Sequence, residues 1–451
     1  MLPTPDDVRK FLADTRADKR ARLIEALLDR PEFADLWAHH LVKPLALTQS
    51  YVAPRRGAAY LHWCRSRIAN DAGLDAIVRD MLVGKNVVIE SGPVSFYSGA
   101  RTPPEWADRA AANFLGVRLE CMQCHSHPAA RWAQDDGQSF TAFFSQVYVE
   151  GIPDGKKKTD LLLMDRSREW YRPGSNDPVT PRFLDGTKPK LKPLEDRRAV
   201  LADWVASPKN PYFARTVANR VWTHLHGKGF GDPESLHEQP VGANDALLDS
   251  LARELADNRF SLKHLVRLIM NSRTYQLSSR TNEHNMDDAR YFSHAYETTR
   301  KSEVLFDAIS QLLEMPARYE GMPPGTRAMQ MLYNTPPLDT FSRPQKLSEC
   351  TDSGVPPDDF KALDVWSMIH SDEFKKRLAD PDNRIGRLLA TKTLTDRDRH
   401  DELHLVGLGV LPNSEARDRF LANLAGAKYR RPLLDERVWG MIASTEFFRR
   451  R

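Results

Sequence analysis

The order of apolar and polar positions predicts a mainly helical chain. From Ser261 to Met270, apolar side chains recur at the i, i+3, i+4, i+7 spacing of one buried helix face, and Ser261 is a typical helix cap. The same spacing recurs one helix earlier, between Leu247 and Leu255. Further helices, separated in many places by Pro and Gly, are predicted at about 17–29, 73–83, 104–120, 194–206, 211–226, 301–314, 359–369, 396–408, 414–425 and 433–446.

Residues from about 140 to 192 depart from the helical pattern. The apolar and aromatic run at 143–149 predicts a strand, and residues 159–164 predict another. A run rich in Pro, Gly and Asp follows at 171–186, where turns are expected. The sequence therefore predicts a small β or irregular insert between the helices.

The length of 451 residues favours two domains over one core. The lysine- and proline-rich stretch near 187–193 gives the boundary between two closely packed helical domains, 1–190 and 191–451. The net charge is only +4 and the charges are interspersed, so the concentrated basic face of a nucleic-acid-binding protein is not expected. No apolar run is long enough to predict a transmembrane segment.

The run Cys121-Met122-Gln123-Cys124-His125 is the strongest chemical signal in the sequence, and it holds two of the four cysteines. Residues 111–120 have a helical pattern, and cysteines three apart on a helix share one face, with about 5–6 Å between their β-carbons. His125 is four residues from Cys121 and shares that face. The spacing is typical of c-type haem, with two thioether bonds from the cysteines and iron ligation by the histidine.

Other interpretations of the motif remain open. A zinc or iron site would use Cys121, Cys124, His125 and His127, together with a ligand from elsewhere because four ligands within seven residues crowd the geometry. A thioredoxin-like redox pair would need a βαβ setting, which the helical surroundings do not provide. An inert motif that binds nothing is the remaining alternative.

Three residues that follow the motif are expected to surround and orient the iron or metal ligands: Trp132, Gln134 and Asp135. The ligand on the opposite haem face is not identified by the sequence. The candidates for this second ligand were chosen only because His and Met side chains can ligate iron. They are His39, His40, His62, Met81, His224 and His226.

The two remaining cysteines, Cys64 and Cys350, are expected to be buried thiols, or a disulfide if the protein is exported. Neither a Gly-x-Ser-x-Gly nucleophile turn nor a glycine-rich phosphate loop occurs in the sequence.

The motif and its flanks resemble a planctomycete cytochrome-like family of unknown function. In residues 114–128 and 131–136, a Cys-x-x-Cys-His-x-His-Pro run is followed by Trp-x-Gln-Asp-Asp, as in that family. The second half resembles the domain of unknown function that usually follows. The segments that carry this second resemblance are 210–215, 219–222, 263–265, 271–276, 300–309, 341–344 and 446–447.

The resemblance implies an exported, periplasmic haem protein that transfers electrons or acts as a haem-dependent oxidoreductase. Its expected partner is a redox protein or a small-molecule or sugar substrate, because such families occur in bacteria rich in polysaccharide-degrading genes. No secretion signal follows Met1, so a cytoplasmic location is expected if Met1 is the native start. The chain also departs from the family pattern at residues 243–246, and of a second cysteine cluster it keeps only Cys350.

Overall fold

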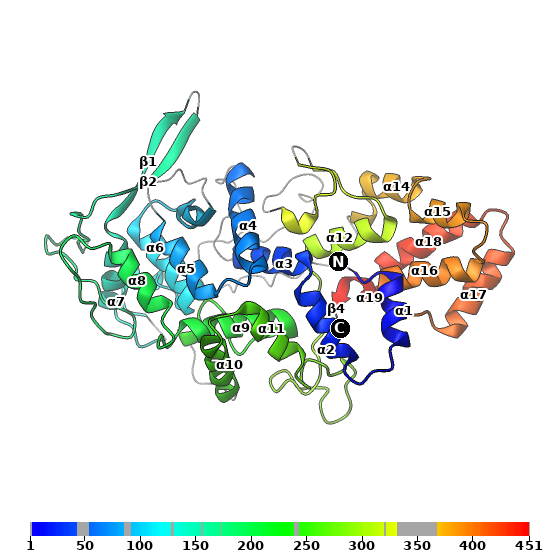
Figure 1. Cartoon of the computed structure of the whole chain (residues 1–451), viewed down its shortest axis with the longest axis horizontal. Helices are drawn as coiled ribbons and strands as arrows, with labels where there is room; N and C mark the ends of the chain where they lie inside the picture. The colour runs from blue at the N-terminus through cyan, green and yellow to red at the C-terminus, as the bar shows by residue number, and fades with distance from the viewer. Residues whose placement is uncertain are drawn as a thin grey trace. The chain divides into compact units, whose positions relative to one another are not determined.

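The protein is mainly helical with a small β hairpin, as the sequence predicts (Figure 1). The computed structural model describes residues 2–42, 54–84, 92–127, 130–154, 157–172, 174–238, 242, 244–319, 322–331 and 368–450. Most of the predicted helix at 359–369 lies outside these residues, as do Cys350 and the family-like segment 341–344. Within the described ranges, no helix combines the length and the apolar composition that a membrane span needs.

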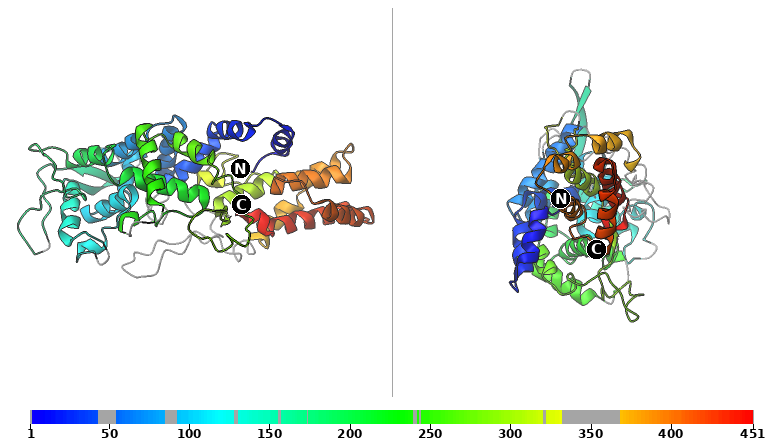
Figure 2. Two further views of the ribbon diagram at one scale, coloured as in Figure 1. Left: turned by 90° about the horizontal axis from the view of Figure 1, so that it is seen from below. Right: turned by 90° about the vertical axis from the view of Figure 1, so that its right-hand side faces the viewer.

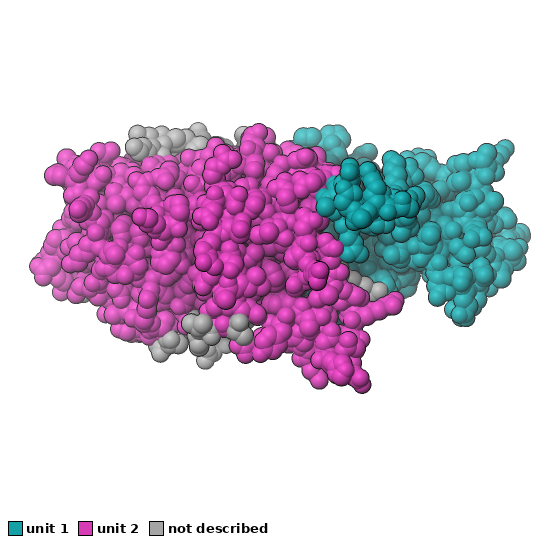
Figure 3. All heavy atoms as spheres, turned by 60° about the horizontal axis from the view of Figure 1, so that its bottom comes forward, with its two compact units in different colours: residues 1–23, 297–347, 353–451 teal, residues 24–296, 348–352 magenta. Residues whose placement is uncertain are grey.

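The chain divides into two compact units, which Figure 3 colours separately. Unit 1 contains residues 1–23, 297–347 and 353–451, and unit 2 contains residues 24–296 and 348–352. The predicted domain boundary near residue 190 lies inside unit 2, so the β insert and the helices that follow it pack in the same unit as the cysteine motif.

Unit 2 holds the motif among amphipathic helices. Its α-helices are α3 (Pro31–Val42), α4 (Pro54–Ala69), α5 (Leu74–Val83), α6 (Pro103–Ala110), α7 (Gln134–Thr141), α8 (Arg197–Val205), α9 (Phe213–His226), α10 (Asp245–Asp257) and α11 (Leu262–Met270), and α2 (Lys19–Leu28) crosses from unit 1. Short helical turns join them at η2 (Gly92–Tyr97), η3 (Ala111–Leu115), η4 (Cys121–Gln123), η5 (Ala142–Phe144) and η6 (Leu236–Glu238). In α11 the predicted face is buried, and the Ser261 hydroxyl accepts the His264 N–H as the predicted cap.

The β insert is an antiparallel hairpin of β1 (Val147–Asp154) and β2 (Lys157–Met164), in which Val147 lies opposite Met164. The predicted first strand begins too early, because residues 142–144 form the turn η5 and the sheet begins only at Val147. Phe143 and Phe144 are instead buried in the helical core, which explains why their apolar character resembled a strand.

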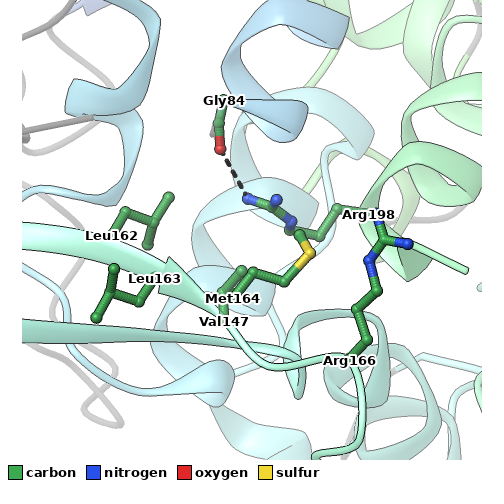
Figure 4. Close-up of a pocket in the computed structure, with 7 residues that line it drawn as sticks. All are labelled: Gly84, Val147, Leu162, Leu163, Met164, Arg166 and Arg198. Atoms are coloured by element: carbon green, nitrogen blue, oxygen red, sulfur yellow. Dashed lines mark hydrogen bonds between the residues drawn. The ribbon is translucent and has the colours of Figure 1, made fainter. Parts of the chain in front are cut away.

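A cavity of about 270 Å³ lies at the base of this hairpin (Figure 4). Its walls are formed by Gly84, Val147, Leu162, Leu163, Met164, Arg166 and Arg198. The buried Arg198 guanidinium donates to the Gly84 carbonyl at 3.1 Å and pairs with Asp196 at 3.2 Å. These partners satisfy the buried charge, so Arg198 ties the start of α8 to the end of α5.

Unit 1 is a helical bundle with its own apolar core. Its elements are α1 (Pro5–Ala13), β3 (Thr298–Thr299), α12 (Ser302–Leu313), η7 (Ala328–Gln330), α14 (Asp372–Ala379), α15 (Arg384–Ala390), α16 (Asp396–Leu408), α17 (Ser414–Ala425), α18 (Arg430–Ile442), α19 (Thr445–Phe448) and β4 (Arg449–Arg450). Helices α16 and α18 run side by side (Figure 2), and Leu403, Val406 and Val438 lie between them and α12. The predicted helix at 433–446 is broken after Ile442, and the short helix α19 begins at Thr445.

A histidine is buried inside unit 1. The His400 side chain is fully buried, and its ring centroid lies 4.8 Å from that of Phe420 and 6.0 Å from that of His404. Burial, and to a smaller extent the charge of Arg437, lower the pKa of His400 to about 4 against the opposing effect of Asp401. His400 is therefore neutral in the folded protein at neutral pH.

This burial predicts that unit 1 loses stability in mild acid. The unfolded chain binds a proton at His400 near pH 6.5, whereas the folded chain does so only near pH 4, so stability falls as the pH drops between these values. A loss of about 2 kcal/mol is expected by pH 5. This loss can be measured by urea unfolding at pH 7 and pH 5, with hydrogen exchange in α16 and α18 as the probe of unit 1.

His400→Leu should reduce this pH dependence, whereas His370→Gln on the exposed surface of the same unit should leave it unchanged. Equal pH dependence in the wild type and in His400→Leu would show that His400 does not cause it.

Candidate functional site

The cysteine motif lies on a short 3₁₀ turn and not on a continuing helix. The predicted helix at 104–120 stops early, since α6 passes into the π-helical turn η3 and Gly116 then adopts a left-handed conformation with φ of 60°. Glycine adopts this conformation readily and commonly ends helices. The expectation of an unbroken helix before the motif was wrong, and Gly116 was the sequence signal that marks the break.

The residues between Gly116 and the motif form an irregular segment without helix or strand structure. Val117 and Leu119 are fully buried, while Arg118 is half-buried and Glu120 is exposed. One carboxylate oxygen of Asp108 accepts the backbone N–H groups of Leu119 at 2.7 Å and Glu120 at 3.0 Å. Asp108 thus holds the entrance to the motif turn from helix α6, a role that the sequence did not reveal.

The turn η4 is anchored by Met122, whose side chain is fully buried. A β-carbon on Gly137 of α7 would lie 2.8 Å from the Met122 β-carbon, so glycine allows α7 to pack directly on the turn. The Gln123 carbonyl accepts the side-chain amides of Gln134 and Gln138, each at 3.2 Å. Gln134 therefore contacts the motif.

The thiols of the motif lie at the protein surface. Cys121 is half-buried, Cys124 is exposed, and no disulfide joins them. A 3₁₀ turn has about three residues per turn, so side chains three apart lie above one another along one edge. Cys64 is in contrast a buried thiol, and burial raises its pKa. The structure thus separates a surface pair from a core cysteine.

His125 is exposed beside Cys124. Its Nδ1 lies 2.7 Å from the Ser126 carbonyl oxygen, which can only accept a hydrogen bond, so Nδ1 carries the proton. With Nδ1–H donating to this carbonyl, Nε2 is the ring atom whose lone pair can bind a metal or a haem iron.

His127 is oriented differently, because both of its ring nitrogens are engaged. Nδ1 accepts the Ala130 N–H at 2.9 Å, and Nε2 lies 3.2 Å from a carboxylate oxygen of Glu238. The side chains of His127 and Glu238 are only 8% and 10% exposed, and burial raises the pKa of Glu238. In this arrangement His127 supports the loop, and metal binding would require it to release one of these partners.

Trp132 and Asp135 lie around the motif in different ways. The Trp132 carbonyl accepts the His127 N–H at 3.0 Å, and its buried indole donates to the Leu184 carbonyl at 3.0 Å. Asp135 pairs with Arg182 at 2.7 Å and with Arg172. Trp132 therefore touches the loop directly, whereas Asp135 fastens the start of α7 to the irregular insert.

A later segment of the chain also reaches the motif, which sequence reasoning missed. The half-buried Arg220 of α9 donates to the Asn113 carbonyl at 2.5 Å and the Ala112 carbonyl at 2.9 Å, and desolvation lowers its pKa to about 10. The His237 N–H donates to the Gly116 carbonyl at 3.2 Å. These contacts join residues more than a hundred positions apart, so no local sequence pattern could predict them.

The candidates for the opposite haem ligand have structural surroundings of their own. Met81 is buried and its sulfur accepts the Tyr60 hydroxyl at 3.3 Å. The rings of His40 and His224 have centroids 3.9 Å apart, and His226 stacks on Trp222. In the part of the chain that the structure describes, no group of three or more His, Cys, Asp or Glu side chains is arranged to hold a metal ion.

Two family models match the chain. Residues 1–148 match "PSCyt2: Protein of unknown function (DUF1549)", and residues 197–364 match "PSD1: Protein of unknown function (DUF1553)". The two are known as a pair of domains of unknown function, in agreement with the resemblance of each half of the sequence. The matches lie on either side of the predicted boundary near 190, although the contacts place residues 24–148 of the first match and 197–296 of the second together in unit 2. No curated protein and no solved structure was found to match the chain.

Residues 216 and 236 pack so closely on Gly116 that adding a side chain there should destabilise the protein. A β-carbon there would lie 2.9 Å from the Thr216 hydroxyl and 3.2 Å from the Leu236 β-carbon, in a backbone conformation that favours glycine. Gly116→Ala should lower the free energy of unfolding by about 2–4 kcal/mol, as measured by urea denaturation.

Gly99→Ala is the matched control, because Gly99 has φ of 74° and no atom within 4 Å of the added β-carbon. Gly99→Ala should lower the free energy of unfolding only by the backbone strain, about 1 kcal/mol. Equal losses of unfolding free energy in the two variants would mean that the contacts with Thr216 and Leu236 do not contribute.

Proposed function

We propose that the protein binds a covalent c-type haem through Cys121, Cys124 and His125 and acts in electron transfer or redox catalysis. The observation that carries the proposal is the surface turn on which two thiols three residues apart are followed directly by an exposed imidazole. Covalent haem attachment needs two accessible thiols and an imidazole from one side of the porphyrin. When bound, the haem would supply a one-electron redox centre.

The residues around the turn fit this role. Met122 seats the turn in the core while its neighbours stay at the surface, and Gln134 and Gln138 hold the Gln123 carbonyl. The Ser126 carbonyl accepts the Nδ1 proton of His125, which leaves the Nε2 lone pair for an iron ligand bond. The turn thus presents the imidazole beside two thiols that are not joined in a disulfide.

A metal site of the zinc type is the alternative. The same two thiols and His125 are suitable ligands, but His127 is held by Ala130 and Glu238. Such a site would therefore take its fourth ligand from outside the motif. Metal content separates the alternatives, because bound zinc gives no visible absorption band whereas haem does.

The proposal includes an exported protein, because haem is joined to thiols on the outer side of the inner membrane. Its partner would then be a redox protein, or a small-molecule or sugar substrate if the protein is a haem-dependent oxidoreductase. An exposed attachment turn suits a protein partner, since electrons could pass at the surface.

The proposal is tested by producing the chain with a secretion signal in a host that has haem-maturation machinery. Intact mass should increase by one haem, and a denaturing gel should show a haem-stained band. His125→Ala should abolish the low-spin haem spectrum while the helices keep their far-ultraviolet circular dichroism.

Cys121→Ser/Cys124→Ser should carry no covalent haem, whereas Cys64→Ala should carry as much as the wild type because Cys64 is in the core. An unstained wild-type band at the mass of the bare polypeptide would refute haem binding. Zinc bound in a 1:1 ratio in that case would favour the alternative.

A further inference from the structure

One carboxylate holds both ends of the motif loop. One oxygen of Glu238 accepts the backbone N–H of Arg118 at 2.5 Å, three residues before Cys121. Its other oxygen lies 3.2 Å from Nε2 of His127, two residues after His125. The Glu238 side chain therefore spans the loop that carries the two cysteines and the histidine.

The hydrogen-bond chemistry of this contact is directional. Because Nδ1 of His127 accepts the Ala130 N–H, Nε2 carries the proton and donates to Glu238. Glu238 thus receives two hydrogen bonds, from a backbone amide and a neutral imidazole, in a buried position where an unsatisfied carboxylate would be costly. The Arg118 guanidinium turns elsewhere, to Asp232 at 3.1 Å.

Neighbouring contacts reinforce this attachment. The His237 N–H donates to the Gly116 carbonyl, and the Arg220 guanidinium donates to two carbonyls within η3, those of Ala112 and Asn113. Each of these side chains and amides lies within residues 197–364, which match one family model, while the loop lies within residues 1–148, which match the other. The two matched segments therefore meet at the motif within unit 2.

We propose that Glu238 is the positioning residue of the haem-binding loop, so that the second family segment completes a centre whose cysteines and histidine come from the first. This inference rests on the proposed haem function for its redox consequence. It gives a physical reason for the pairing of the two domains, because the loop of one is held by a side chain of the other.

The first test uses the full-length protein without haem. Glu238→Ala should speed amide hydrogen exchange of residues 117–127 at least about tenfold, because Arg118 loses its acceptor. Glu254 provides the matched control, since it pairs with His264 at the same 3.2 Å but on the surface of unit 2. Glu254→Ala should leave exchange in the loop unchanged.

The second test uses the haem-loaded protein and the milder variant Glu238→Gln, whose amide cannot accept both hydrogen bonds. Removing a negative charge that contacts the haem-binding loop should favour the reduced form of the haem. The equilibrium constant for haem reduction should rise roughly three- to tenfold, measured as a more positive midpoint potential. Glu254→Gln should keep the wild-type potential. A purely structural role for Glu238 would not produce this shift.

The outcomes separate the two proposals. Unchanged loop exchange in Glu238→Ala, or a Glu238→Gln potential equal to that of Glu254→Gln, overturns the positioning role even if haem is bound. If the wild type binds no haem but Glu238→Ala still speeds exchange in the loop, the haem function is overturned. Glu238 then remains the residue that positions the loop.

Discussion

The left-handed turn at Gly116 is the constraint on which the geometry of the site depends. It ends the helical run of α6 and η3, and Val117 and Leu119, which follow it in an irregular segment, are buried in the core. Because Gly116 has no side chain, Leu236 and His237 approach closely and bring Glu238 to the loop. With any larger residue at this position, the contact between the two family segments would have to open.

The site combines a fixed backbone with accessible reactive groups. Met122 is buried beneath Gly137, and the backbone on either side of it is held by Asp108 and by two glutamines of α7. Cys124 and His125 nevertheless remain exposed. A turn held mainly by its backbone leaves its side chains available, which is what the attachment of an external group requires.

Sequence reasoning identified the features that depend on local periodicity or local chemistry. Helix α11 follows from its buried face and the cap Ser261, and the hairpin follows from two β-rich runs beside turn residues. Gln134 was identified from its nearness to the motif. The end of the helix before the motif was available from Gly116 and was overlooked, because the apolar residues on both sides continued the helical spacing.

The contacts of Glu238 and Arg220 were beyond sequence reasoning for a different reason. Glu238 is 111 residues from His127, and nothing in its neighbourhood distinguishes it from a surface glutamate until the fold brings them together. A ligand for the opposite face of the proposed haem could not be predicted from the sequence for the same reason, since ligation depends on spatial convergence and not on residue type alone.

This separation along the chain also sets an order of events during synthesis. The ribosome adds about 5–20 residues per second, so the motif emerges roughly 6–22 s before Glu238. During that interval the loop lacks its buried carboxylate, and its cysteines belong to an incompletely folded chain. Long-range contacts of this kind form late in folding, so the reactive turn acquires its final shape only once α9 and η6 have docked against it.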